Sequence, residues 1–131
     1  EELLNSLSLL SVLQNIRSIT LYLDVKYINY LEALKNYQYP EISKKISVLL
    51  SSSPGENSQE SDDMKHSIFS YFLFKGLKGE AMGEDNILEL GELAEYLFRK
   101  IPDYSANLNE GFLQNSEFIG SDLKRVLIDL R

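Results

Sequence analysis

The stretch "SITLYLDVKYINY", residues 18–30, carries a strand pattern from which the fold can be worked out. Ile19, Leu21 and Leu23 alternate with Thr20 and Tyr22, so a buried strand is expected over residues 18–24. A second strand is expected at "ISVLLSS", residues 46–52. Its consecutive apolar positions are typical of a strand that is covered on both faces.

Helical patterns alternate with these strands. Leucines at helical spacing predict a helix over residues 3–16, and a shorter helix is expected over 28–37. The hydroxyl-rich stretch 51–63 predicts a loop, and Asp62 or Asp63 at its end is expected to cap the next helix. The remaining expected elements are a helix over 65–79, a helix over 91–101 followed by Pro102, a largely irregular stretch over 103–122 and a last strand over 125–130.

This order of elements predicts an α/β fold with a mainly parallel sheet flanked by helices. Only three strands are expected. The strands at 18–24 and 46–52 are apolar on both faces, as in strands inside a larger sheet. We therefore expect the sheet to be incomplete in this chain.

Composition excludes several classes of function. The 131 residues suggest one domain, and the net charge of −7 with scattered basic residues argues against nucleic-acid binding. No apolar run reaches the length of a membrane span. The chain has no cysteine and one histidine, His66, which excludes a cysteine nucleophile, disulfides, and cysteine-based or histidine-rich metal sites in this chain. We expect no cofactor and no metal.

The N-terminus is neither an initiator methionine nor a signal peptide, so a processed or excised piece of a longer protein is expected. The sequence leaves the compartment undetermined; for a soluble chain without cysteine, the cytoplasm is favoured.

Two helical motifs and a tail carry a resemblance to a known family. The tail is "LQNSEFIGSDLKRVLIDL", residues 113–130. Over residues 46–130 the chain resembles the C-terminal part of bacterial caspase-like cysteine peptidases, relatives of metacaspases. The matching residues are His66, Ser67, Phe69, Ser70, Tyr71, Leu73, Gly76, Leu77 and Gly79 in the first helix, and Glu92, Leu93, Tyr96, Ile101 and Pro102 in the second.

The resemblance extends upstream to the strand that bears the family's nucleophilic cysteine. Leu23, Asp24 and Tyr27 match that segment, and Lys26 stands where the cysteine would be. The family's catalytic histidine would precede residue 1. The resemblance thus implies that residues 1–131 are the C-terminal half of a caspase-like domain, with a helix, the nucleophile strand and its connection in 1–45 and a small-subunit-like part in 46–131.

The resemblance also assigns a substrate pocket. Glu60, with Ser58 and Ser52, lies in the loop that lines the family's pocket for a basic side chain, and a carboxylate there favours Arg or Lys. Pro54 stands where metacaspases carry a further pocket aspartate. The other interpretation of this loop is a solvated acidic segment that caps the next helix.

The remaining charged candidates have plainer explanations. An ammonium at its ordinary pKa is not a nucleophile, so Lys26 is interpreted as a charged residue past a strand end that reaches solvent or pairs with Asp24. His66 is interpreted as the start of a scaffold helix, with no catalytic role. The expected catalytic set in this chain is therefore empty.

Three functions follow from these patterns. The first is a non-catalytic pseudo-peptidase that acts through protein–protein contacts in a larger polypeptide or complex. The second is the small-subunit side of an active peptidase whose Cys and His lie on another chain or an upstream segment. The third is an unrelated α/β binding domain. The partners expected for the first two are the missing N-terminal half or a companion subunit, with a peptide or protein ligand.

Overall fold

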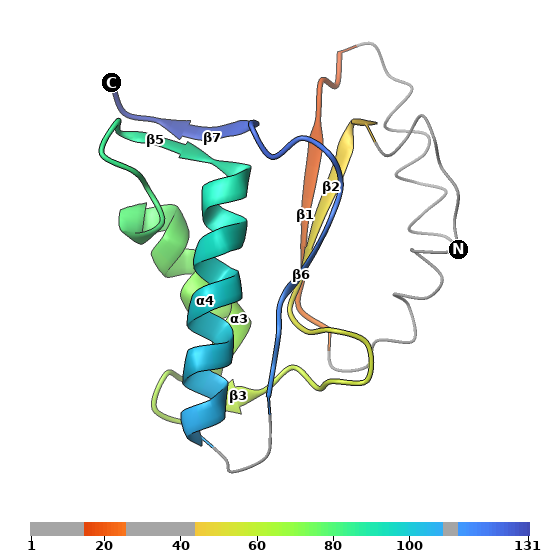
Figure 1. Ribbon diagram of the computed structural model, residues 1–131, viewed down its shortest axis with the longest axis vertical. Helices are drawn as coiled ribbons and strands as arrows, with labels where there is room; N and C mark the ends of the chain where they lie inside the picture. The colour runs from red at the N-terminus through yellow and green to blue at the C-terminus, as the bar shows by residue number, and fades with distance from the viewer. Residues whose placement is uncertain (1–14, 26–43, 109–112) are drawn as a thin grey trace.

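The computed structural model describes residues 15–25, 44–108 and 113–131 as a mixed α/β arrangement (Figure 1). Its main sheet has three strands in the order β1-β2-β6, with β1 at Ile19–Leu23, β2 at Ile46–Leu50 and β6 at Glu117–Ile119. The strands expected at 18–24 and 46–52 are confirmed. β1 and β2 pair in parallel and β6 is antiparallel to β2, so this sheet is mixed where the sequence led us to expect a mainly parallel one.

The other elements lie mainly on one side of this sheet (Figure 1). Two helices follow each other and pack together there, with a π-helical turn after the first. Two short two-stranded sheets, of which one is a hairpin, flank them. The bounds are β3 at Glu60–Ser61, β4 at His66–Ser67, α3 at Ile68–Lys75, η2 at Gly76–Glu80, β5 at Ile87–Glu89, α4 at Leu90–Leu108 and β7 at Val126–Asp129.

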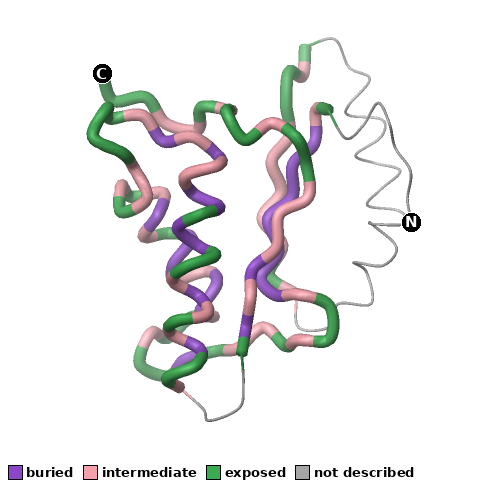
Figure 2. Tube along the Cα trace, viewed as in Figure 1, coloured by how far each residue is buried: buried purple, intermediate pink, exposed green. Residues whose placement is uncertain are grey.

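Both faces of β2 are buried, which explains its consecutive apolar residues (Figure 2). Leu49 faces the helices, while Ile46, Val48 and Leu50 pack on the opposite face with side chains of β1. The helix-side core is the larger of the two. Its buried members besides Leu49 are Ile68, Phe69, Phe72, Leu73, Leu88, Leu90, Leu93, Ala94, Tyr96, Leu97 and Ile101.

The helix expected over 65–79 begins later and has a different cap. His66 and Ser67 form β4, and Ser67 is the N-cap of α3, because its extended backbone (φ −61°, ψ 149°) lets its Oγ accept the Ser70 N–H at 3.0 Å. The prediction of Asp62 or Asp63 as the cap is therefore wrong. These two aspartates lie in the turn between β3 and β4.

The second helix continues through the proline that was expected to follow it. α4 runs from Leu90 to Leu108 with Pro102 inside, although proline has no N–H for the helix ladder. Ile101 and Ser105 are buried on either side of Pro102, and the Ser105 hydroxyl donates to the Pro102 carbonyl at 3.2 Å. Tertiary burial thus overrides the local preference, and the stretch 103–122 contains a helix end and a strand.

The last expected strand, 125–130, exists as β7 but pairs with β5, an element that the sequence did not indicate. The two form a separate two-stranded antiparallel sheet beside the start of α4 (Figure 1). The three expected strands therefore do not share one sheet. The helices expected over 3–16 and 28–37 lie outside the described residues, apart from the ends at 15–16.

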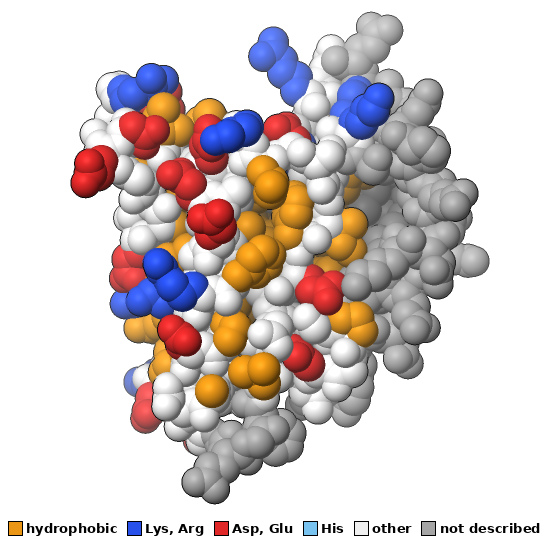
Figure 3. Space-filling view, in the orientation of Figure 1, with side chains coloured by type: hydrophobic (Ala, Val, Ile, Leu, Met, Phe, Trp, Pro, Cys, Tyr) orange, Lys and Arg blue, Asp and Glu red, His pale blue; other side chains and the backbone are white. Residues whose placement is uncertain are grey.

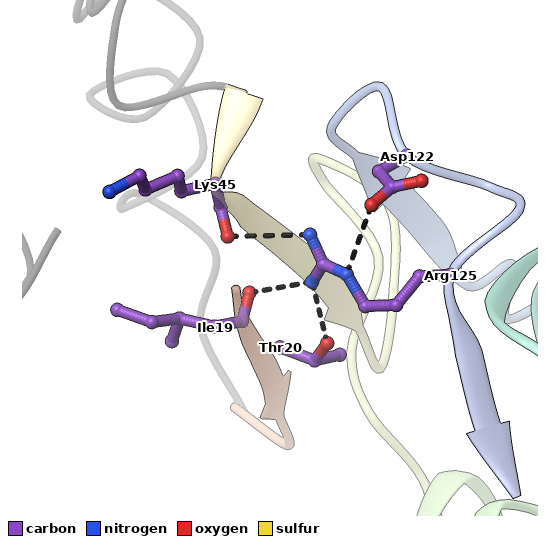
Figure 4. A network of polar contacts seen from close by, with 5 residues as sticks. All are labelled: Ile19, Thr20, Lys45, Asp122 and Arg125. Carbon is purple, nitrogen blue, oxygen red and sulfur yellow. Dashed lines mark hydrogen bonds and ion pairs between the residues drawn. The ribbon is translucent and has the colours of Figure 1, made fainter. Parts of the chain in front are cut away.

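Arg125, just before β7, ties this small sheet to the main one (Figure 4). Its guanidinium donates to the Ile19 carbonyl at 3.0 Å, the Thr20 hydroxyl at 2.9 Å and the Lys45 carbonyl at 3.3 Å. It also pairs with Asp122 at 3.3 Å. The Arg125 side chain is only 9% exposed, so one buried cation joins the starting ends of β1 and β2 to the C-terminal segment.

Candidate functional site

Asp24, directly after β1, collects hydroxyl groups from two later segments. Ser58 Oγ donates to Asp24 Oδ1 at 2.7 Å. Ser70 Oγ donates to Oδ2 at 2.9 Å, and Ser67 Oγ donates to the same oxygen. One carboxylate therefore joins the end of β1, the loop after β2 and the first turn of α3.

The ends of β1 and β2 are themselves joined by backbone and serine contacts. The Ser51 N–H donates to the Leu23 carbonyl at 2.9 Å, and the Val25 N–H donates to Ser51 Oγ at 3.1 Å. Ser51 is fully buried. The parallel pairing thus continues past the last residue of each strand, which fixes where Asp24 leaves the sheet.

A cavity of about 390 Å³ opens beside this cluster. Antiparallel pairing of β3 with β4 sets Glu60 opposite Ser67, which belongs both to the cavity wall and to the Asp24 cluster. The wall carries two carboxylates, one ammonium and one imidazole. Its residues are Glu60, Ser61, Asp62, Lys65, His66 and Ser67.

The loop between β2 and β3 is held by the segment that precedes β6. The Glu56 carboxylate accepts the Asn115 N–H at 2.6 Å, the Asn115 side-chain amide at 2.7 Å and the Ser53 N–H at 3.3 Å. The fully buried Gln114 carboxamide bonds to both ends of the loop, at Ser51 and at Gln59. The loop that carries Ser58 and Glu60 therefore has a defined shape.

The structure brings together part of the predicted site. Ser58 lies in the Asp24 cluster, and the exposed Glu60 lines the adjoining cavity. Ser52 does not reach either feature, because it is buried and its hydroxyl is directed to the Glu56 carbonyl at 3.5 Å. Lys26 lies outside the described residues. His66 belongs to β4, where its ring packs edge-on against Phe74.

Among the described residues, the Asp24 cluster does not contain the serine–histidine pair of a nucleophilic site. A serine nucleophile needs a base that takes its proton, as histidine does in a catalytic triad. Here three serine hydroxyls donate to Asp24 directly, and within the described ranges His66 hydrogen-bonds none of them. The described residues also hold no group of three or more His, Cys, Asp or Glu side chains suited to a metal ion.

A second, smaller cavity of about 270 Å³ lies between η2 and α4, away from the Asp24 cluster. Beside it the Tyr96 hydroxyl donates to Glu80 at 2.6 Å, and Lys75 pairs with Glu80 at 2.9 Å. Burial is the main cause that raises the pKa of the Tyr96 phenol, and this hydrogen bond is the second cause. The same hydrogen bond is the main cause that lowers the pKa of Glu80. These contacts are explained by the packing of η2 on α4.

Charged side chains are spread over the visible face of the molecule (Figure 3). Lys and Arg side chains stand at several separate places there, with Asp and Glu between them.

No helix in the described part of the chain is long and apolar enough to cross a membrane.

The sequence missed several residues of the site. It gave Asp24 as a motif position and a possible partner of Lys26, and gave Ser67 and Ser70 only as motif positions. It placed Gln114 and Asn115 in a tail that resembles the family and in a largely irregular stretch, without a contact for either. Their roles depend on contacts between residues 43 to 63 positions apart in the chain, for which one sequence carries no signal.

Comparison with known proteins adds no relative. No protein-family model matches the chain, and no curated protein or solved structure matches it either.

Proposed function

We propose that this chain is a non-catalytic, caspase-like module that binds a basic segment of a partner protein at the end of β1. The observation that carries the proposal is the absence of cysteine from all 131 residues of a chain whose motifs resemble a cysteine peptidase family. The resemblance places Lys26 at the nucleophile position, where an ammonium at its ordinary pKa cannot attack a carbonyl. The caspase-like layering and the incomplete sheet belong to the same proposal.

The charges of the site support a cationic ligand. Among the described residues, the exposed Glu60 side chain has neither a hydrogen bond nor an ion pair, so its carboxylate is open to a ligand. Asp62 adds a second carboxylate to the cavity wall. Arginine matches this chemistry best, since its guanidinium forms paired hydrogen bonds with a carboxylate. The Lys65 ammonium on the same wall repels a ligand that is purely cationic. It favours a ligand that carries a hydrogen-bond acceptor beside its cation.

The test uses the full chain and three fluorescein-labelled hexapeptides that differ at one position, Arg, Lys or Asp. Fluorescence anisotropy is expected to show tighter binding of the Arg peptide than of the Asp peptide. Glu60→Gln is expected to weaken Arg-peptide binding about two- to fivefold, the range of an exposed ion pair. Glu84→Gln, at an exposed carboxylate in the turn before β5, is the matched control. Equal affinity for the Arg and Asp peptides would overturn the proposal.

The second candidate is the small-subunit side of an active peptidase whose Cys and His lie on another chain or an upstream segment. The resemblance of residues 46–130 to the family's C-terminal part supports it, but it must explain why the β1 segment is in this chain. The resemblance puts the family's nucleophile on this strand. The two candidates differ in an assay of the intact assembly with the Arg, Lys and Asp peptides. Cleavage that iodoacetamide abolishes requires a cysteine on a companion chain and supports the second candidate, whereas peptide binding without cleavage supports the first.

A further inference from the structure

The side chain of Gln114 occupies a central place behind the candidate site. It is fully buried and lies between β2, the loop after β2 and the C-terminal part of α4. The carboxamide Oε1 accepts the Gln59 N–H at 2.9 Å, and Nε2 donates to the Ser51 carbonyl at 2.7 Å. The Gln114 backbone N–H donates to Ser105 Oγ at 3.0 Å.

The bond from Gln114 to Gln59 holds the loop backbone that carries Ser58 and Glu60. Gln59 lies between Ser58, which donates to Asp24, and Glu60, which lines the cavity. The Gln59 carbonyl accepts the Ile68 N–H at 2.9 Å. The Gln59 peptide groups are thus held from one side by Gln114 and from the other by the start of α3.

The carboxamide supplies both bonds in this buried place without carrying a charge. The Gln114 carboxamide offers an acceptor and a donor at one end, whereas methionine offers neither a comparable donor nor a comparable acceptor. A buried N–H or carbonyl that loses its partner is costly, so the loop backbone must move to find water. Asparagine keeps the amide but is one methylene shorter and cannot span both contacts unchanged.

We propose that Gln114 is a positioning residue: its carboxamide holds Gln59 so that Glu60 meets the ligand in one fixed geometry. The ligand part of this inference rests on the proposed function. A ligand group held in place before binding loses less conformational freedom on binding, which is how Gln114 increases affinity without touching the ligand.

The experiment measures two quantities on the full chain. The first is amide hydrogen exchange at Gln59, followed by NMR, and the second is the affinity of the fluorescein-labelled Arg hexapeptide. Gln114→Met is expected to accelerate Gln59 exchange at least about tenfold and to weaken peptide binding about three- to fivefold, which is no more than the loss expected from Glu60→Gln. Ser105→Ala is the matched control, because it removes a bond to the Gln114 backbone and leaves the carboxamide contacts in place.

The control is expected to stay within about twofold of the wild type in both quantities. The inference is overturned if Gln114→Met lowers thermal stability while Gln59 exchange and peptide affinity match those of Ser105→Ala. Gln114→Asn replaces the methionine variant if the latter does not fold, with the same expected results. If the wild type binds no Arg peptide, the proposed function fails, and Gln59 exchange alone decides the positioning role.

Discussion

The Asp24 carboxylate accepts a hydrogen bond from the Ser58 hydroxyl at 2.7 Å, although the two residues are 34 positions apart in the chain. Ser67 and Ser70 donate to the same carboxylate from the first turn of α3. The negative charge therefore lies next to a helix N-terminus, where the helix dipole favours it. Asp24 serves as a common acceptor for the loop and the helix that form the candidate site.

Replacing this acceptor should loosen both segments. In Asp24→Asn, an amide that donates replaces one oxygen that accepts, so at least one serine hydroxyl loses its bond. We expect the free energy of unfolding in urea at pH 7 to fall by about 1–2 kcal/mol, because these charge-assisted bonds are solvent-exposed. Ser58→Ala removes one donor only and should cost about half as much. A loss in Asp24→Asn no larger than in Ser58→Ala would contradict the role of a common acceptor.

Among the residues of the C-terminal segment, Arg125 should be the one whose replacement lowers the free energy of unfolding most. Arg125→Met leaves the Ile19 and Lys45 carbonyls without this donor, and we expect a loss of about 2–4 kcal/mol in urea unfolding. Arg125→Lys should recover less than half of it, since one ammonium cannot reproduce the planar fork. Asp122→Asn alters only an exposed partner, 46% accessible, and should cost less than about 0.5 kcal/mol. Equal losses in Arg125→Met and Asp122→Asn would count against this account.

The hydrogen bond from Tyr96 to Glu80 predicts a pH effect in the alkaline range. Burial and this bond raise the pKa of Tyr96 in the folded state above its ordinary value of 10.0. The stabilisation is therefore complete below pH 10 and is lost as the pH rises toward the folded-state pKa. Tyr96→Phe should cost about 1 kcal/mol at pH 8, and its difference from the wild type should shrink at pH 10.5. Urea unfolding at both pH values measures this, and a constant difference would contradict it.

Lys65 has a positive φ of 56° in the turn between β3 and β4, a conformation that side chains with a Cβ rarely adopt. Lys65→Gly should raise the free energy of unfolding by about 0.5–1 kcal/mol, since the relief of strain exceeds the added entropy of the unfolded chain. Lys65→Ala keeps the Cβ and should give no gain. Thermal and urea unfolding of both variants would show whether the backbone conformation of Lys65, rather than its charge, limits the stability of this turn. An equal gain in both variants would contradict the role of the backbone.

The central strands could be predicted from the sequence because their pattern reflects burial directly. β2 has five consecutive buried residues, and β1 alternates beside it. Ser58 and Glu60, which the resemblance singled out, lie in and beside the Asp24 cluster, respectively, and their role in a pocket stays a prediction. These successes depend on local patterns of three to eight residues, which one chain displays without help from its neighbours.

The failures come from contacts between elements and from elements too short to leave a pattern in the sequence. Pro102 is a local helix breaker, yet α4 continues because Ile101 and Ser105 are buried against other elements. Ser67 caps α3 because the β3–β4 hairpin sets its backbone, so the nearby aspartates are not needed. β7 was expected but its partner β5 was not, since a three-residue strand has too short a pattern to recognise.

The hydrogen bond from Arg125 to the Ile19 carbonyl joins residues 106 positions apart, and this separation has a consequence for the kinetics of folding. Closing so long a loop loses much chain entropy before the contact forms, and proteins rich in such distant contacts fold slowly. We therefore expect helices α3 and α4, which are close in sequence, to pair early and the link made by Arg125 to form last. Weakening that link should accordingly speed unfolding and leave the refolding rate nearly unchanged, so the guanidinium sets how long the native state persists.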